Sequence, residues 1–197
     1  MFYWFIRYCV LGLSKIFFPF KVYGLDNIPA EGAFVYASNH ISYLDPVVLA
    51  ISCRRRISFV AKDTLFKNKP FGLFLTHLDA FPIKRDSADI GAIKETLRRL
   101  KQGRAVLIFP EGTRVQDPAH REVQSGVGMI VVKSGVPVIP VHVAGTNEVL
   151  PEGAKFFRRH EITIHIGEPI NFSPEIPYQT IAQQIMVQID ALAPLPR

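Results

Sequence analysis

The sequence predicts an α/β domain with a central, largely parallel sheet of about six or seven strands flanked by helices. Short apolar and β-branched runs alternate along the chain with segments of helical periodicity. A parallel strand needs a long crossover connection, and a helix between two strands supplies it. With 197 residues, 48% of them hydrophobic and 20% charged, the chain suffices for one sizeable core. We therefore expect one domain over residues 25–197, preceded by a distinct segment over residues 1–24.

The expected strands are short runs rich in Val, Ile, Phe and Ala. Four of them are followed by turn-forming residues and then by a helical pattern, which is the order of elements in a parallel sheet. The runs span residues 33–38, 56–61, 79–84, 105–110, 137–143 and 161–167.

Two amphipathic helices are expected in the same region. The clearer one covers about residues 87–102, where Asp86 or Ser87 can cap the start and Gly103 can terminate the helix. Its apolar residues recur at spacings of three, four and three: Ile90, Ile93, Leu97 and Leu100. A second helix is expected over residues 178–192, on the same kind of periodicity.

The segment over residues 1–24 is the most apolar part of the chain. Arg7, Ser14 and Lys15 interrupt it, so it contains no unbroken apolar run of the roughly 18 to 20 residues that a spanning helix needs. As a helix it would present a wide apolar face: Phe2, Phe5, Ile6, Cys9, Leu13, Ile16, Phe17 and Phe20. Arg7, Ser14 and Lys21 would align on a narrow polar stripe. The pattern predicts an amphipathic helix in a membrane interface, with packing on the domain's own core as the alternative.

The charge balance indicates an anionic partner. Lys and Arg number 23 against 17 Asp and Glu, giving a net charge of +6 and a pI near 9.4. Such a partner can be a nucleic acid, a phospholipid surface or a phosphorylated substrate. No nucleic-acid recognition motif is present, which disfavours the first. Cys9 and Cys53 have no metal or disulfide spacing and His120, His142 and His165 are scattered, so we expect no metal and a reducing compartment.

The stretch NHISYLDP, residues 39–46, contains a candidate catalytic pair. On a regular helix, positions five apart point about 140° away from each other, so His40 and Asp45 can meet only across a turn. Pro46 suits the first helical position and leaves Asp45 as the expected N-cap. A carboxylate there can fix one imidazole nitrogen and free the other to take a proton from a substrate hydroxyl. The alternative is a loop histidine near an ordinary helix start.

The stretch FPEGTR, residues 109–114, forms a second polar loop after a strand. Gly112 permits a backbone turn, Thr113 offers a hydroxyl, and Arg114 offers a planar donor fork that suits phosphate. By itself the stretch is equally an ordinary turn with a solvated arginine. Functional loops of parallel sheets lie beyond the carboxyl ends of strands, and both stretches follow strands. The pair of loops therefore indicates one site.

These two stretches and VPVIPVHVAGT, residues 136–146, resemble the glycerolipid acyltransferases, specifically the 1-acylglycerol-3-phosphate acyltransferase branch, over about residues 25–170. The resemblance implies that His40 is the general base and that Asp45 orients it. It also implies binding of the acceptor's phosphate by Arg114. The remaining implied substrate-binding residues are Lys62, Arg85, Glu111, Gly112 and Thr113.

The resemblance implies acyl transfer from acyl-CoA or acyl carrier protein, as co-substrate and without a cofactor, to the 2-hydroxyl of 1-acylglycerol 3-phosphate. It also implies a monotopic or peripheral protein on the cytoplasmic face of a membrane. Val115 and Gln124 stand where many relatives have serine and lysine, which leaves a different lysolipid acceptor open. A catalytically silent lipid-binding scaffold is the alternative from another class, and the presence of His40, Asp45 and Arg114 disfavours it.

Overall fold

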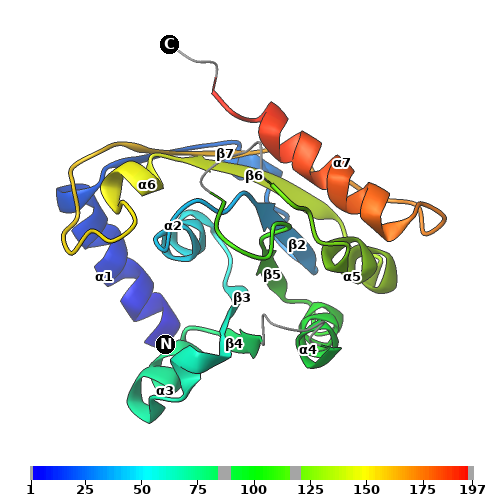
Figure 1. Ribbon diagram of the computed structural model, residues 1–197, viewed down its shortest axis with the longest axis horizontal. Helices are drawn as coiled ribbons and strands as arrows, with labels where there is room; N and C mark the ends of the chain where they lie inside the picture. The colour runs from blue at the N-terminus through cyan, green and yellow to red at the C-terminus, as the bar shows by residue number, and fades with distance from the viewer. Residues whose placement is uncertain (1, 84–89, 116–120, 195–197) are drawn as a thin grey trace.

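In a computed structural model, which describes residues 2–83, 90–115 and 121–194, a sheet of seven strands forms the centre of the molecule (Figure 1). The strand order is β1-β7-β6-β2-β5-β3-β4, and neighbouring strands are parallel except for the antiparallel pair β6 and β7. The strands are β1 (Phe20–Tyr23), β2 (Phe34–Ser38), β3 (Ile57–Lys62), β4 (Ala80–Ile83), β5 (Ala105–Ile108), β6 (Val138–Ala144) and β7 (Ile162–Ile166). The predicted fold class and its six strands are confirmed.

Helices cover both faces of the sheet (Figure 1). The helices are α1 (Phe2–Phe17), α2 (Asp45–Ser52), α3 (Lys69–His77), α4 (Ile90–Lys101), α5 (Gly126–Ser134), α6 (Thr146–Val149) and α7 (Tyr178–Ala191), with short 3₁₀ turns η1 (Leu25–Asn27) and η2 (Asp63–Phe66). The two predicted helices are α4 and α7, although residues 87–89 lie outside the described part of the chain.

The buried strands divide the core into two layers. On β2, Phe34 and Tyr36 belong to the cluster beneath α2, whereas Val35 and Ala37 belong to the cluster beneath α4, α5 and α7. This alternation follows from the period of two along a strand. Because both faces of β2 are covered, all five of its residues are buried.

Strand β1 was not predicted, because its four residues continue the apolar segment that precedes them. Phe20 and Lys21, which the helical pattern placed on α1, lie in β1 instead. There Phe20 pairs with Ile162 and Lys21 pairs with Thr163 of β7. The helix itself ends at Phe17.

Helix α1 turns its polar stripe toward the protein rather than toward solvent. The guanidinium of Arg7 donates to the carbonyls of Ile51 (2.8 Å) and Cys53 (3.0 Å), at the end of α2. Free carbonyls at a helix carboxyl end attract a positive charge, which explains this contact. Ser14 is fully buried as well. No helix in the described part of the chain is both long enough and apolar enough to span a membrane.

The outward side of α1 is correspondingly apolar. Its most exposed large residues are Phe5 (65%), Tyr8 (63%) and Leu13 (53%). The interfacial helix therefore stays a prediction, and the structure shows that its polar stripe would face the protein. The helix rests on the rest of the protein through Arg7, Ser14 and the buried Tyr3, which leaves four residues of the predicted apolar face exposed: Phe2, Phe5, Cys9 and Leu13.

Candidate active site

The candidate site lies at the edge of the sheet where β2, β5 and β6 end. These strands are adjacent and parallel, in the order β6-β2-β5, so the segments that follow them meet. NHISYLDP follows β2, FPEGTR follows β5, and Gly145 and Thr146 follow β6. The structure therefore brings together the three stretches on which the resemblance rests.

His40 and Asp45 form a buried pair. Nδ1 of His40 lies 2.8 Å from Oδ2 of Asp45, and the two residues are 5% and 0% exposed. The same oxygen accepts the backbone N–H groups of Ile41 and Ser42, both at 2.7 Å. With Nδ1 directed at a carboxylate, Nε2 is the nitrogen left to accept a proton. The turn between the two residues is the one that their spacing required.

The N-cap assignment of Asp45 was wrong. Helix α2 begins at Asp45 itself, with Leu44 as the N-cap and Pro46 within the first turn. The Asp45 carboxylate is turned back onto the N–H groups that precede the helix, rather than capping those inside it. These two hydrogen bonds to Asp45 close the turn that follows His40.

The backbone and ring of His40 are held by the stretch after β5. Its N–H donates to Oε2 of Glu111 (2.7 Å), and its carbonyl accepts from the N–H of Val115 (2.8 Å). The imidazole stacks on Phe109, with ring centroids 3.9 Å apart and an angle of 16° between the planes. The histidine is therefore fixed in position and orientation before any substrate binds.

Glu111 connects the two loops from inside the protein. Its side chain is buried, and burial raises its pKa to about 7 against the opposing effect of Arg121. Nε of Arg121 lies 3.1 Å from Oε1 of Glu111. The resemblance implied that Glu111 binds substrate. In the structure, its carboxyl group contacts His40 and Arg121.

Arg114 lies over the His40 loop. Its guanidinium carbon is 3.6 Å from the ring centroid of Tyr43, and Nη2 lies 3.1 Å from Oε1 of Glu152. Its side chain is 18% exposed, and both partners are largely exposed. The stacked tyrosine restrains the guanidinium plane and leaves its edge available to a phosphate.

The other predicted residues have different positions. Gly112 has a φ of 69°, the left-handed conformation that its turn needs, and Thr113 next to it is exposed. Lys62 is exposed at the carboxyl end of β3, one strand beyond β5 at the same edge of the sheet. Arg85 lies outside the described residues, as does His120.

Among the residues that sequence reasoning missed, two fix the His40 loop to β6 and to the start of α6. The side-chain amide of Asn39 both donates to the carbonyl of Val143 (2.9 Å) and accepts from its N–H (2.8 Å), which fixes the His40 loop to β6. Thr146 donates its hydroxyl to Oδ1 of Asp45. Both residues stood within the quoted stretches, beside His40 and at the end of VPVIPVHVAGT, but no local spacing showed their partners.

Comparison with known proteins places the chain among acyltransferases. Residues 19–144 match the family described as Acyltransferase. The 1-acyl-sn-glycerol-3-phosphate acyltransferase of Bacillus subtilis is 32% identical over 152 residues, which make up 77% of this chain and 73% of that protein. The chloroplastic relative BAT2 of Brassica napus is 31% identical, and the chain spans 46% of its length.

A solved structure shows the same architecture. The crystal structure of the 1-acyl-sn-glycerophosphate acyltransferase PlsC from Thermotoga maritima matches with a TM-score of 0.71 and 28% identity, over 97% of this chain and 83% of that one. The chain belongs to the acyltransferase family. Within that family it is a PlsC-like protein.

Proposed function

We propose that this protein transfers a fatty acyl group from acyl-CoA or acyl carrier protein to the 2-hydroxyl of 1-acylglycerol 3-phosphate, forming phosphatidic acid. The observation that carries the proposal is the fixed His40–Asp45 pair, 2.8 Å apart, in the loop whose Tyr43 ring lies against the Arg114 guanidinium. Two relatives that match most of the chain are named 1-acyl-sn-glycerol-3-phosphate acyltransferase, which supports the acceptor.

His40 acts as the general base in this proposal. Nε2 takes the proton of the 2-hydroxyl as its oxygen attacks the thioester carbonyl, and the tetrahedral intermediate collapses with loss of the thiolate. The imidazolium then returns the proton to the thiolate, so the donor leaves as a free thiol. Asp45 stabilises the imidazolium through Nδ1, and the buried position limits competition from water.

Arg114 binds the acceptor's phosphate in this proposal. A phosphate entering beside Tyr43 replaces the Glu152 carboxylate as the partner of the guanidinium. Binding energy gained at the phosphate aligns the 2-hydroxyl with His40. Lys62 is placed at the same edge of the sheet, and the resemblance adds Arg85.

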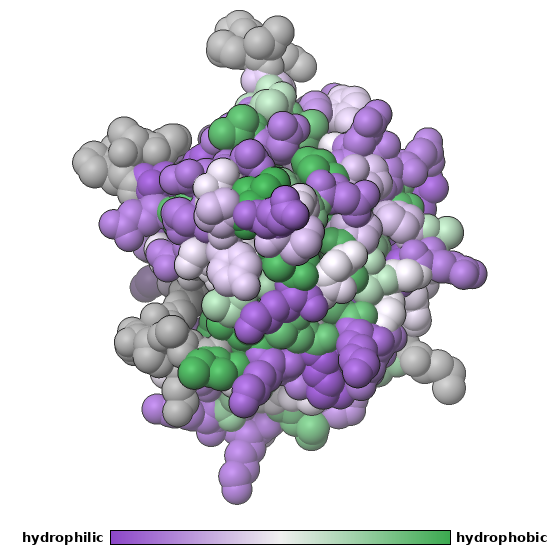
Figure 2. All heavy atoms as spheres, turned by 90° about the vertical axis from the view of Figure 1, so that its right-hand side faces the viewer, coloured by the Kyte–Doolittle hydropathy of each residue, from purple (hydrophilic) through white to green (hydrophobic). Residues whose placement is uncertain are grey.

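Membrane contact through α1 supplies the lipid substrates, with the protein monotopic or peripheral on the cytoplasmic face. The uncovered face of α1 continues onto α3, because Phe2 and Phe74 meet edge to face at 6.2 Å and Leu73 is 61% exposed. On the side that carries α5 and α7, by contrast, hydrophobic side chains show only between hydrophilic ones (Figure 2). The apolar surface on α1 and α3 suits a lipid interface.

The acceptor is tested by a panel that includes the alternatives. Val115 contributes its backbone N–H to His40, and Gln124 packs beside Gly112, so both departures from the family pattern border the candidate site. Oleoyl-CoA and oleoyl-acyl carrier protein are each offered with 1-acylglycerol 3-phosphate and with other lysolipids. Transfer only to another lysolipid would retain the mechanism and change the substrate.

The base is tested with His40→Ala beside a matched control, His160→Ala, which changes an exposed histidine far along the chain. We expect His40→Ala to abolish phosphatidic acid formation and His160→Ala to leave it intact. Transfer that persists in His40→Ala would refute the mechanism, and no transfer by wild type to any acceptor would favour the scaffold.

A further inference from the structure

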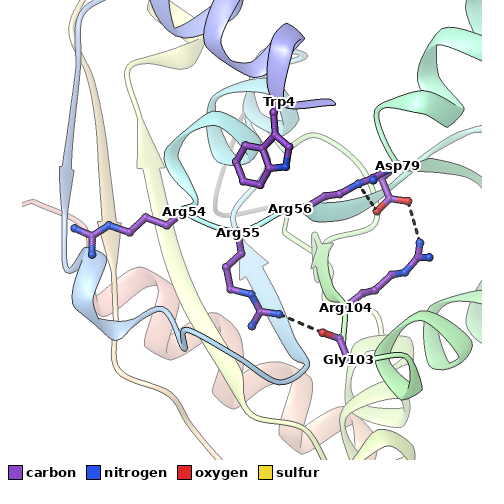
Figure 3. A pocket seen from close by; sticks show the side chains of 7 residues that line it. All are labelled: Trp4, Arg54, Arg55, Arg56, Asp79, Gly103 and Arg104. Carbon is purple, nitrogen blue, oxygen red and sulfur yellow. Dashed lines mark hydrogen bonds and ion pairs between the residues drawn. The ribbon is translucent and has the colours of Figure 1, made fainter. Parts of the chain in front are cut away.

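A cavity of about 410 Å³, shown in Figure 3, is lined by residues at the end of the sheet opposite to the one that His40 follows. Its arginine triplet precedes β3, Asp79 precedes β4, and Gly103 and Arg104 precede β5, so its walls come from the amino ends of these strands. His40 and Arg114 follow the carboxyl ends of β2 and β5. The lining residues are Trp4, Arg54, Arg55, Arg56, Asp79, Gly103 and Arg104.

The cavity has more positive charge than its single carboxylate can balance. Asp79, which is 5% exposed, contacts Nε of Arg56 at 3.2 Å and Nη1 of Arg104 at 3.2 Å. From the protein side the same carboxylate also receives Nη1 of Arg99 at 2.7 Å. Arg55 adds a further guanidinium, directed at the carbonyl of Gly103 (3.2 Å). Figure 3 shows Arg54 pointing away from this group.

Two of these arginines retain donors for a ligand. Among the described contacts, Arg56 binds Asp79 through Nε alone and Arg104 binds it through Nη1 alone. Each guanidinium has five N–H donors in a planar fork. The side chains are 48% and 44% exposed, so the remaining donors are accessible. Two forks that converge on one carboxylate from different strands form a suitable cradle for a second anion with several oxygens, such as a phosphate.

Trp4 connects this cavity with the apolar side of α1. It lines the cavity from the first turn of the helix (Figure 3). Phe5, the next residue along the helix, is 65% exposed. Tryptophan favours the boundary between lipid chains and headgroups, where its indole meets both apolar and polar surroundings. A phosphate held beneath Trp4 therefore lies at headgroup depth when α1 contacts a membrane.

We infer that this cavity binds the phosphate of an anionic phospholipid headgroup, at a site separate from the acyl-transfer site. The inference rests on the proposed contact of α1 with a membrane and is independent of the chemistry at His40. It gives the enzyme a preference for anionic membranes that comes from a specific pocket rather than from net charge alone.

The single tryptophan of the sequence, Trp4, makes the occupancy measurable by fluorescence. Soluble dihexanoyl-phosphatidylglycerol, dihexanoyl-phosphatidylcholine and inorganic phosphate are titrated separately into wild type. We expect a saturable change in Trp4 emission with phosphatidylglycerol, at an affinity about tenfold or more above that for the other two. His40→Ala should give the same titration, which separates this site from the proposed catalysis.

The arginines are tested by Arg56→Gln and Arg104→Gln, singly and together. Each single variant leaves Asp79 paired with Arg99 and one further arginine, so the fold is retained. We expect the double variant to bind phosphatidylglycerol about tenfold or more weakly. The matched control replaces Arg158 and Arg159, both exposed on another segment, with Gln and makes the same change in net charge.

Three outcomes would overturn the inference. The first is no saturable change in Trp4 emission with phosphatidylglycerol, and the second is equal loss of affinity in the control variant. The third is binding of inorganic phosphate as tight as that of the lipid, which would assign the cavity to a free anion. If the double variant does not fold, the affinities of the two single variants are compared with that of the control variant instead.

Discussion

The hydroxyl of Thr146 donates a hydrogen bond to Oδ1 of Asp45, while Oδ2 of the same carboxylate faces Nδ1 of His40. Both residues of the first contact are fully buried. The two carboxylate oxygens therefore have different partners. Oδ1 binds the first residue of α6, and Oδ2 orients the imidazole of His40. Thr146 acts on the proposed base through Asp45 and is a positioning residue.

Thr146→Val keeps the side-chain shape and removes the hydroxyl, which leaves a buried carboxylate oxygen without its partner. A hydrogen bond to a charged group contributes about 1.5–3 kcal/mol, so we expect kcat to fall about tenfold or more, with a smaller change in KM. Steady-state kinetics measure this. Thr146→Ser, which retains the hydroxyl, should restore most of the rate, and Thr64→Val, at an exposed threonine, should be neutral. Unchanged kcat in Thr146→Val would contradict the assignment.

The raised pKa of Glu111, about 7, predicts a pH-dependent stability. Its folded pKa lies above the ordinary value of 4.5, so the protonated form is favoured in the folded state. The protonated Glu111 therefore adds to the free energy of unfolding. This stabilisation is fully present below pH 4.5 and is lost as pH rises through about 7. Relative to Glu111→Gln, we expect wild type to lose up to about 3 kcal/mol of unfolding free energy between pH 4.5 and pH 8.

Urea denaturation at pH 4.5 and pH 8 measures this difference. Glu175→Gln, at an exposed glutamate, is the control and should follow wild type at both pH values. A difference between wild type and Glu111→Gln that stays constant with pH would show that Glu111 does not titrate in this range.

The sequence predicted the sheet and the His40 turn because both depend on local patterns. Alternating apolar runs predict strands, and a spacing of five before Pro46 requires a turn. The orientation of α1 was not predictable in this way, because the burial of Arg7 depends on carbonyls of Ile51 and Cys53, more than forty residues away. A helical-wheel projection shows that the helix has a polar face and an apolar face. It does not show which of the two packs against the rest of the protein.

The same reason accounts for the missing parts of the site. Thr146 lies 101 residues from Asp45, and Asn39 lies 104 residues from Val143. These contacts follow from the adjacency of β2 and β6, which only the strand order reveals. Residue types at the ends of strands indicate a site, whereas the contacts that fix those residues come from the topology.

Removal of the Glu152 carboxylate should favour the acceptor. Glu152 lies 3.1 Å from Arg114 and is 62% exposed, so in the proposed role of Arg114 it competes with the acceptor's phosphate for the guanidinium. Exposed pairs contribute about 0–1 kcal/mol, and we therefore expect Glu152→Gln to lower KM for 1-acylglycerol 3-phosphate by about two- to fivefold, with kcat unchanged. Glu148→Gln, nearby and exposed, is the control. A KM raised in Glu152→Gln would indicate that Glu152 positions Arg114 instead.

The outward face of α1 should determine membrane binding without contributing to stability. Phe5 and Leu13 are 65% and 53% exposed, so Phe5→Gln with Leu13→Gln removes apolar surface that the folded protein does not bury. Burying such a side chain in a lipid interface is worth about 1.5–3 kcal/mol, and we expect the double variant to bind zwitterionic phosphatidylcholine vesicles at least about tenfold more weakly. Co-sedimentation with vesicles measures binding, and the thermal midpoint should change little.

The matched control for α1 is Val187→Gln. Val187 is 63% exposed on α7, and the side of the molecule that carries α7 shows mostly hydrophilic side chains (Figures 1 and 2). It should leave vesicle binding unchanged, because that side faces water when α1 contacts the membrane. Equal loss of binding in both variants would show that apolar exposure in general, and not α1, drives association. A large fall in the thermal midpoint of the α1 variant would show that this face packs within the protein.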